Sequence, residues 1–178
     1  CPGYHGLGLE GYLRDTAVLG VLVHHLLPGL HQQLEALDVP LLVLGLDHFI
    51  ALGARNWPFG PVVRLWDAVL SEGSPAVFAS FLALLELCLP AAITEAASPE
   101  DGVSAGDGSG GAPAVADGNA DPSPADVMDC FKRGVHRAAS DDLDRLLQRT
   151  WEFVPLVSQS LLDRLRKEIS TEEEQGEG

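Results

Sequence analysis

Residues 62–90 read VVRLWDAVLSEGSPAVFASFLALLELCLP, and this stretch decides the fold. Its apolar residues recur at three- and four-residue spacing on both sides of Gly73-Ser74-Pro75, which is the pattern of two successive helices. Gly73 is expected to end the first helix, and Ser74 to cap a second one that has Pro75 at its first position and runs to Pro90. Apolar residues alternating with period two, which are typical of strands, are missing, so the sequence predicts an all-α fold.

The residues before this stretch also predict helices. Asp15 is expected to cap a helix that ends at Pro28-Gly29, and a short helix from about Leu30 to Leu37 follows. The next helix is expected to start at Asp38, with Pro40 in its first turn, and its residues 41–52 have apolar side chains on nearly all faces. It is therefore predicted to be the central helix of the core.

Residues 95–125 consist of Ala, Gly, Ser, Pro and acidic residues without an aromatic side chain. Such a composition cannot bury enough apolar surface to offset a backbone entropy of roughly 1–2 kcal/mol per residue. Helices resume after Ser123, after Ser140 and after Pro155. The predicted organisation is helices over 1–92, a disordered acidic insertion over 93–122, closing helices over 123–169 and a disordered acidic tail over 170–178.

The chain has 178 residues and a formal net charge of −15, from 11 Lys and Arg against 26 Asp and Glu. Many of the acids fall in residues 95–125 and in the tail after Lys167, where no basic residue accompanies them. The charge therefore belongs mostly to segments expected to be flexible. Such acidity argues against nucleic acid, or an anionic membrane surface, as the main partner.

The three cysteines, Cys1, Cys88 and Cys130, lie far apart, and no two form a C-x-x-C pair. Neither a disulfide framework nor a zinc knuckle is indicated, which fits a reducing, intracellular compartment. Polar residues and a proline interrupt the longest apolar stretches, 16–30 and 39–54. No integral membrane segment is expected.

Two patterns could indicate a ligand site, and each has a simpler interpretation. Residues 6–11 spell G-x-G-x-x-G before a helix, but no strand precedes or follows them, so a permissive loop is favoured over a dinucleotide site. His24, His25 and His31 could suggest a metal, but Pro28 breaks the helix between them, and surface or half-buried histidines are favoured. No cofactor and no metal ligand is assigned.

The remaining polar residues near apolar helices are predicted to be structural. Asp47 and His48 are adjacent and point apart on a helix, so His48 is expected at the edge of the core and not in a catalytic pair. Ser71, Ser74 and Ser80 have no plausible His partner and no G-x-S-x-G elbow. Trp66 is expected to be buried against the central helix.

Asp67 follows Trp66 near the end of its predicted helix. A carboxylate there more often accepts hydrogen bonds from a backbone N–H or an Arg than performs acid–base chemistry. Arg64 is one candidate partner. Asp67 is therefore also expected to be structural.

Several of these segments together resemble a TBC domain. Residues 63–73 are similar to that family's "lriWD-x-ll-x-eG" block, and residues 48–52 to its "WF-L-x-L" helix. Residues 27–37 resemble its "LP-x-L-x-x-x-L" element. Residues 4–88 are covered well and 126–167 more loosely, with Leu165-Arg166 where such domains often have Leu-Arg. The chain is identified as resembling the C-terminal half of a TBC domain.

This resemblance implies an all-helical GTPase-activating fold that acts on Rab-type small GTPases by supplying an Arg and a Gln to the GTP site. An Arg supplied in this way can raise the rate about 10³- to 10⁵-fold. The two residues belong to "I-x-x-D-x-x-R" and "Y-x-Q-G" motifs in the N-terminal half of the domain. Neither motif occurs in this sequence, and Arg14 and Arg55 lie in other contexts. No catalytic residue is therefore assigned.

The leading hypothesis is the C-terminal part of a TBC-type GTPase activator, which is not itself a GTPase and is inactive as this fragment. The alternative is a non-catalytic GTPase-binding or scaffolding helical protein. Either would have a GTP-bound Rab-type GTPase as its partner. The expected location is cytoplasmic, at the periphery of endomembranes, with a role in vesicle trafficking.

Overall fold

The computed structural model describes residue 4 and residues 8–98 and 122–176, and within them all regular structure is helical. The predicted all-α fold is confirmed. The order of elements is α1 (Glu10–Leu26), α2 (Pro28–Ala36), α3 (Leu41–Ala51), α4 (Phe59–Glu72), α5 (Ser74–Ala97), α6 (Pro124–Asp141), α7 (Leu143–Phe153), the short 3₁₀ helix η1 (Val154–Leu156) and α8 (Gln159–Gly176).

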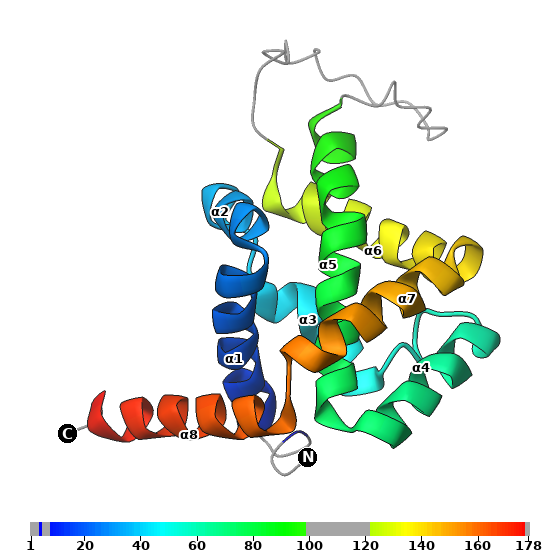
Figure 1. Ribbon diagram of the computed structural model, residues 1–178. Coiled ribbons are helices and arrows are strands. Elements are labelled where there is room, and N and C mark those ends of the chain that lie inside the picture. Colours follow the sequence, from blue (N-terminus) through cyan, green and yellow to red (C-terminus); the bar gives the residue numbers. More distant parts are fainter. Residues whose placement is uncertain (1–3, 5–7, 99–121, 177–178) are drawn as a thin grey trace.

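The central helix is α5, and the prediction that residues 41–52 would occupy the centre is wrong. In Figure 1, α5 runs through the middle of the molecule, with α6 and α7 crossing it and α1 beside it. Its buried side chains lie all around its axis and include Phe78, Phe81, Leu82 and Leu85. The shorter α3 begins at Leu41 and not at Asp38, as Asp38 has a φ of 51° outside the helix. It buries only one side and leaves Leu42, Val43 and Leu46 exposed.

The turn between α4 and α5 depends on Gly73, which ends α4 as predicted. Its φ of 71° and ψ of −142° belong to a backbone region that residues with a Cβ avoid. Gly73 is also the N-cap of α5, while Ser74 is the first helical residue and its side chain makes no capping hydrogen bond. The predicted Ser74 cap is therefore wrong by one position.

The prediction that the second helix ends at Pro90 is wrong, because α5 continues to Ala97. Pro90 is exposed, while its neighbours Leu89 and Ala92 remain buried, so packing outweighs the one backbone hydrogen bond that proline removes. Residues 93–97, assigned to the insertion, are thus helical. Residues 99–121, the rest of the predicted disordered stretch, lie outside the described residues.

By length and composition, α5 is also the one described helix that is apolar enough to cross a bilayer. It lies outside residues 16–30 and 39–54, the longest apolar stretches of the sequence. Within the molecule 67% of the apolar window of α5 is buried. Its apolar surface is covered by neighbouring helices, as expected of a core helix.

The prediction that Asp15 caps a helix is wrong, because α1 begins at Glu10 and Asp15 lies inside it. Its carboxylate is buried and accepts two hydrogen bonds from Arg166 of α8, with Nε at 2.7 Å and Nη2 at 2.8 Å. The hydroxyl of Tyr4 donates a third, at 2.6 Å. This bidentate pair fastens the first described helix to the last one, 151 residues away.

The boundaries of the closing helices differ from the prediction in two places. Ser123 caps α6 as expected and accepts a hydrogen bond from the Asp126 N–H at 3.2 Å. Ser140 is no cap, because α6 continues to Asp141. The last helix, α8, reaches Gly176, so residues 170–176 of the predicted disordered tail are helical. Glutamate has a high intrinsic helix propensity.

We predict that Asp15→Asn lowers the free energy of unfolding by about 3–5 kcal/mol, because it leaves the mostly buried Arg166 guanidinium without its buried counter-charge. Urea unfolding of the 178-residue chain measures this. Asp163→Asn is the matched control, since Asp163 contacts the same guanidinium at 3.6 Å but is exposed. Its expected cost is at most about 1 kcal/mol. Equal losses in the two variants would contradict the role given to the buried pair.

Candidate functional site

Four exposed apolar side chains form one row on α4, and two of them are the most exposed large apolar residues of the described part of the chain. Phe59, Val63, Trp66 and Leu70, spaced four, three and four residues apart, share one side of the helix; we call them the α4 stripe. Phe59 and Leu70 are each 84% exposed. A contiguous exposed row of large apolar side chains indicates a surface that binds another molecule.

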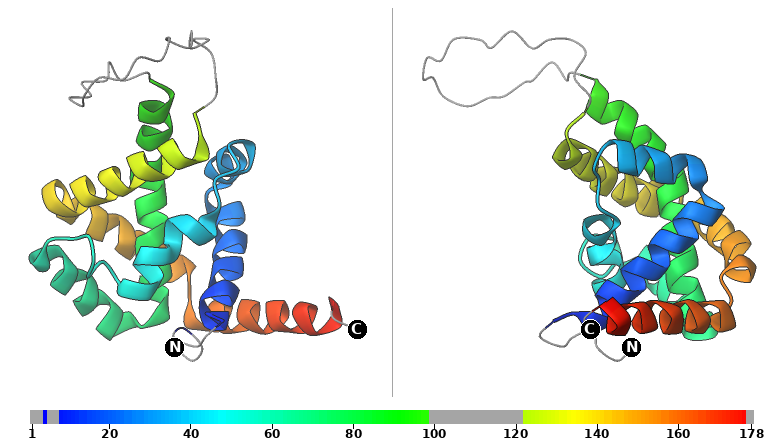
Figure 2. Two further views of the ribbon diagram at one scale, coloured as in Figure 1. Left: turned by 180° about the vertical axis from the view of Figure 1, so that it is seen from behind. Right: turned by 90° about the vertical axis from the view of Figure 1, so that its left-hand side faces the viewer.

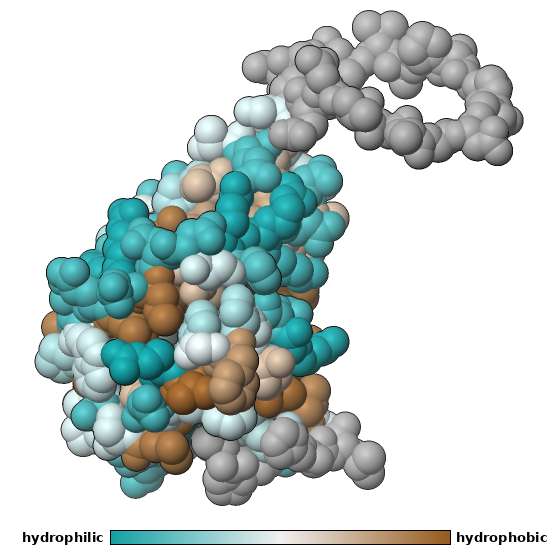
Figure 3. All heavy atoms as spheres, turned by 90° about the vertical axis from the view of Figure 1, so that its right-hand side faces the viewer, coloured by the Kyte–Doolittle hydropathy of each residue, from teal (hydrophilic) through white to brown (hydrophobic). Residues whose placement is uncertain are grey.

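The packing of α4 explains why this row faces outward. Val62, Leu65 and Ala68 are the buried residues of α4, and of the other elements the helix packs mainly against α5. In Figure 1, α4 lies at the lower right, away from α1 and α8. Figure 3 shows brown, apolar atoms gathered over the lower half of the face that carries α4.

The prediction that Trp66 is buried against the helix of residues 41–52 is wrong. Trp66 is 44% exposed, and its Nε1–H donates a hydrogen bond to the backbone oxygen of Leu52 at 3.1 Å. Its neighbour Val63 is exposed on the same side of α4, whereas Val62 is buried. Periodicity shows which residues share a face of α4, but the packing of the whole fold decides which face is buried.

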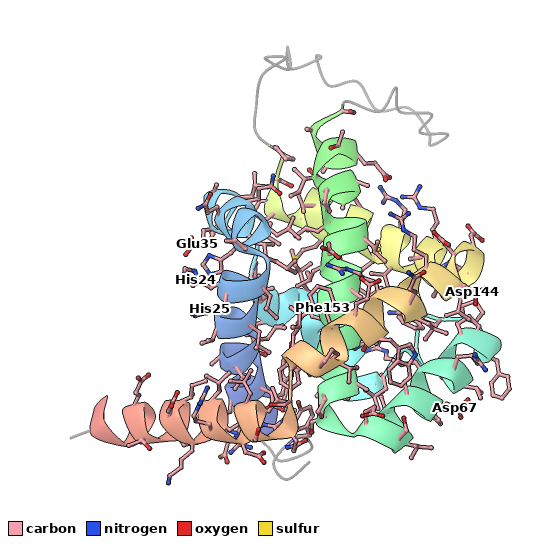
Figure 4. All side chains as sticks on the ribbon, viewed as in Figure 1. His24, His25, Glu35, Asp67, Asp144 and Phe153 are labelled. Atoms are coloured by element: carbon pink, nitrogen blue, oxygen red, sulfur yellow. The ribbon has the colours of Figure 1, made fainter. Side chains whose placement is uncertain are left out.

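Asp67 also differs from the prediction. It is exposed on α4 (Figure 4), and within the described part of the chain no hydrogen bond or salt bridge reaches its carboxylate, including from Arg64. Arg64 and Asp67 both lie on the solvent side of α4, next to the α4 stripe. They supply its polar border.

His48 is buried on α3 and reaches α5, as expected for a histidine at the edge of the core. Its Nε2 lies 3.1 Å from the backbone oxygen of Val77 and 3.0 Å from Ser80 Oγ. The Val77 carbonyl oxygen can only accept hydrogen bonds, and the Ser80 hydroxyl donates to it as well. Nε2 therefore carries the ring proton and donates to this oxygen. Burial lowers the pKa of His48 to about 4, so the ring is neutral at physiological pH.

Sequence reasoning missed the contact between Ser80 and His48, since it found no His partner for this serine. The pair is not arranged for nucleophilic catalysis. The nitrogen near Ser80 holds a proton and cannot accept another, and Ser80 is 1% exposed. Asp47 points away and instead accepts hydrogen bonds from Arg55 and Asn56, each at 3.0 Å.

A cavity of about 530 Å³ lies beside His48. We call it the His48 pocket; it is bounded by α3, the connection after α3, α5 and α6. Gly53 shapes one wall, because a Cβ there would lie 3.0 Å from the Trp57 ring, and its φ of 77° also disfavours other residues. Its lining residues are Val43, Leu44, Asp47, His48, Gly53, Arg55, Asn56, Trp57, Phe81, Leu84, Met128, Phe131, Lys132, Arg133, Val135 and His136.

The three histidines near the α1–α2 junction lie closer together than the sequence suggested. The ring of His24 is 4.8 Å from that of His31 and 5.2 Å from that of His25, and His31 Nδ1 lies 3.3 Å from a carboxylate oxygen of Glu35. Figure 4 shows His24, His25 and Glu35 where α1 leads into α2. Among the described residues, no three His, Cys, Asp or Glu side chains are grouped so as to hold a metal ion.

Two other predicted features add no site. Most of the glycine pattern over residues 6–11 precedes α1, and residues 5–7 lie outside the described residues. Cys88 and Cys130 are buried free thiols, and burial raises the pKa of each. A thiol of raised pKa is a poor nucleophile at neutral pH.

The structure thus defines an all-helical protein with an exposed apolar helix face suited to a protein partner. Comparison with known proteins gives the family: the model of the Rab-GTPase-TBC domain matches residues 1–92, just over half of the chain. The chain belongs to this family, and the resemblance found in the sequence is confirmed.

Curated relatives match over the same part. Carabin from Mus musculus is 39% identical over 89 residues, which are 49% of this chain and 20% of that protein. Growth hormone-regulated TBC protein 1 from Xenopus laevis is 35% identical over 85 residues, 48% of this chain and 25% of that protein. GTPase-activating protein gyp2 from Schizosaccharomyces pombe is 28% identical over 86 residues, 48% of this chain and 12% of that protein. The matched region spans at most a quarter of these relatives, and no solved structure matches the chain.

We predict that His48 makes the protein less stable as the pH falls from about 6.5 to about 4. In this window the unfolded chain binds a proton at residue 48 and the folded chain does not, so stability is lost as pH falls. The difference between the two pKa values corresponds to a loss of roughly 3 kcal/mol.

Urea unfolding at a series of pH values tests this with two variants. His48→Gln keeps an N–H donor but does not titrate, so its stability should fall less over this window than that of the parent. His25→Gln, at an exposed histidine of α1, should leave the slope unchanged. A parent-like slope in His48→Gln would show that residue 48 does not cause the effect.

Proposed function

We propose that this chain is the C-terminal part of a TBC-type GTPase-activating protein that acts on Rab-family small GTPases, and that the α4 stripe contributes to docking the GTP-bound GTPase. Family membership supports the GTPase as partner. The name of one relative, GTPase-activating protein gyp2, supports the activity. The observation that carries the docking surface is the exposed apolar row on α4.

The stripe has the chemistry of a protein interface. Aromatic residues supply much of the energy at such surfaces, and the stripe presents Phe59 and Trp66. Arg64 and Asp67 border it with charges of both signs, which favour a specific orientation of the partner. Such a border around an apolar centre matches the anatomy of protein interfaces.

The same chain lacks the "I-x-x-D-x-x-R" and "Y-x-Q-G" motifs. In the structure Arg55 is paired with Asp47 and Arg166 with Asp15, so these two arginines already neutralise carboxylates of the fold. The activity proposed here therefore requires an Arg and a Gln supplied from outside these 178 residues. Without them, the chain would be a GTPase-binding scaffold, which is the alternative function. Either function would place the protein in the cytoplasm, on the periphery of endomembranes and in vesicle trafficking.

We expect Leu70→Ser to weaken binding of the chain to its GTP-loaded Rab at least tenfold, because Leu70 is the most exposed aliphatic residue of the stripe. Calorimetry over a panel of Rab proteins, each loaded with a non-hydrolysable GTP analogue or with GDP, measures this. Leu156→Ser is the matched control, since Leu156 is an exposed leucine of η1, outside α4. Binding that is absent for every Rab, or equally weakened by both variants, would reject the docking surface.

The chain alone is expected not to accelerate GTP hydrolysis by any Rab, because none of its arginines stands in the motif that delivers an Arg to the γ-phosphate. Single-turnover hydrolysis over the same panel measures this. Adding the sequence upstream of Cys1 in the open reading frame separates the two functions: gain of activity supports the activator, and binding without activity supports the scaffold. Stimulation of tenfold or more by the 178 residues alone would overturn this assignment.

A further inference from the structure

The His48 pocket lies apart from the α4 stripe and plays no part in the proposed docking. Seen from behind, α3 and α6 both cross in front of α5 (Figure 2, left). The pocket lies where these helices meet the connection after α3. Its volume of about 530 Å³ falls within the range of small-molecule sites, about 300–1,000 Å³.

The inner walls of the pocket are apolar. Leu44, Phe81 and Leu84 are buried core residues that also line it, and Trp57 and Phe131 add aromatic surface. His48 also belongs to this wall. Its Nε2 is already hydrogen-bonded to Val77 and Ser80 of α5. The ring is neutral, so nothing in the wall offers a charge to the interior. Such walls suit an aliphatic chain.

The charged residues of the lining are predominantly basic, although the whole chain is acidic. Arg55, Lys132 and Arg133 line the pocket against a single acid, Asp47, which is paired with Arg55. Arg133 is held by Glu95 at 2.8 Å. Within the part of the chain that the structure describes, the ion pair of Lys132 is an exposed contact to Asp129, at 3.4 Å, which is weak in water. The Lys132 ammonium group is therefore the cation most available to a ligand.

His136 lies one helical turn after Lys132 on α6 and lines the same pocket. Its Nδ1 lies 3.4 Å from the hydroxyl of Ser140, on the exposed side of the helix. Lys132 and His136 together form a polar edge beside apolar walls. This arrangement distinguishes the pocket from an empty packing defect, which is apolar throughout.

We propose that the His48 pocket binds a single-chain amphiphile, with its aliphatic chain along Phe81, Leu84 and Phe131 and its anionic head beside Lys132. A carboxylate and a phosphate head share the chemistry that Lys132 recognises. The two sources, a fatty acid and a lysophospholipid, are distinguished by the experiment. A neutral long-chain alcohol would make the contacts with the apolar walls but would lack the charge interaction with Lys132.

Trp57 makes the proposal measurable, because it is part of the pocket wall. In the full 178-residue chain, Trp66→Phe and Trp151→Phe remove the two other tryptophans, both of which are exposed. Bromine atoms on an acyl chain quench tryptophan fluorescence at short range. The probes are a brominated fatty acid, a brominated lysophosphatidic acid and a brominated alcohol of equal chain length, each below its critical micelle concentration.

We expect saturable quenching of Trp57 by at least one anionic probe, with the alcohol binding at least tenfold more weakly. The anionic probe that binds more tightly identifies the source. Lys132→Gln should reduce the affinity for the anion several-fold and leave that for the alcohol unchanged. Quenching that does not saturate, or an alcohol that binds as tightly as both anions, would overturn the proposal.

A matched pair of substitutions on α3 tests the location. Val43 and Leu42 are neighbours with exposures of 42% and 40%, but only Val43 lines the pocket. Val43→Phe should narrow the pocket and weaken the bound amphiphile at least tenfold, while Leu42→Phe should not. Thermal unfolding of both variants verifies that they fold. Equal effects of the two folded variants would place the probe elsewhere and reject the site.

Discussion

A helix that is apolar around its whole circumference must be covered on every side, and this constraint on α5 organises the molecule. Its buried residues pack mainly against α6 and α7, and further against α4, α2, α8 and α3. Glu86 of α5 pairs with Arg149 of α7, so even the partly exposed side of α5 is held by a neighbour. The other helices need only one apolar side each, which leaves their outer faces available for recognition.

The Asp15–Arg166 pair has a different role, because it acts at the edge of this core. The Arg166 guanidinium also lies 5.7 Å above the ring of Phe78, so one side chain contacts α1 and α5 from α8. A buried pair of this kind adds little net stability compared with apolar packing. It does require one arrangement of three helices, since a shifted helix would leave a charge buried and unpaired. The pair therefore specifies the position of α8 more than it stabilises the fold.

The sequence predicted what local rules determine. The helical class, the ends of helices at Pro28 and Gly73 and the start of α6 at Ser123 all follow from residues close in sequence. The central helix, the exposure of Trp66 and the partners of Asp15 depend on contacts between distant residues, which periodicity does not contain. The His48 pocket needs four separate elements, and the pairing of Ser80 with His48 spans 32 residues. The tertiary arrangement, rather than any motif, creates this candidate site.

Glu95 helps to align α5 with α6 independently of the chain that connects these two helices. Its carboxylate near the end of α5 is held by Arg133 and Arg137 of α6, each at 2.8 Å, and α5 and α6 also pack extensively against each other. The two helices are thus aligned by their own surfaces and not by the length of chain that joins them. A polypeptide cut within that connection would retain both halves of this interface. The domain is therefore suited to reconstitution from two separately expressed fragments.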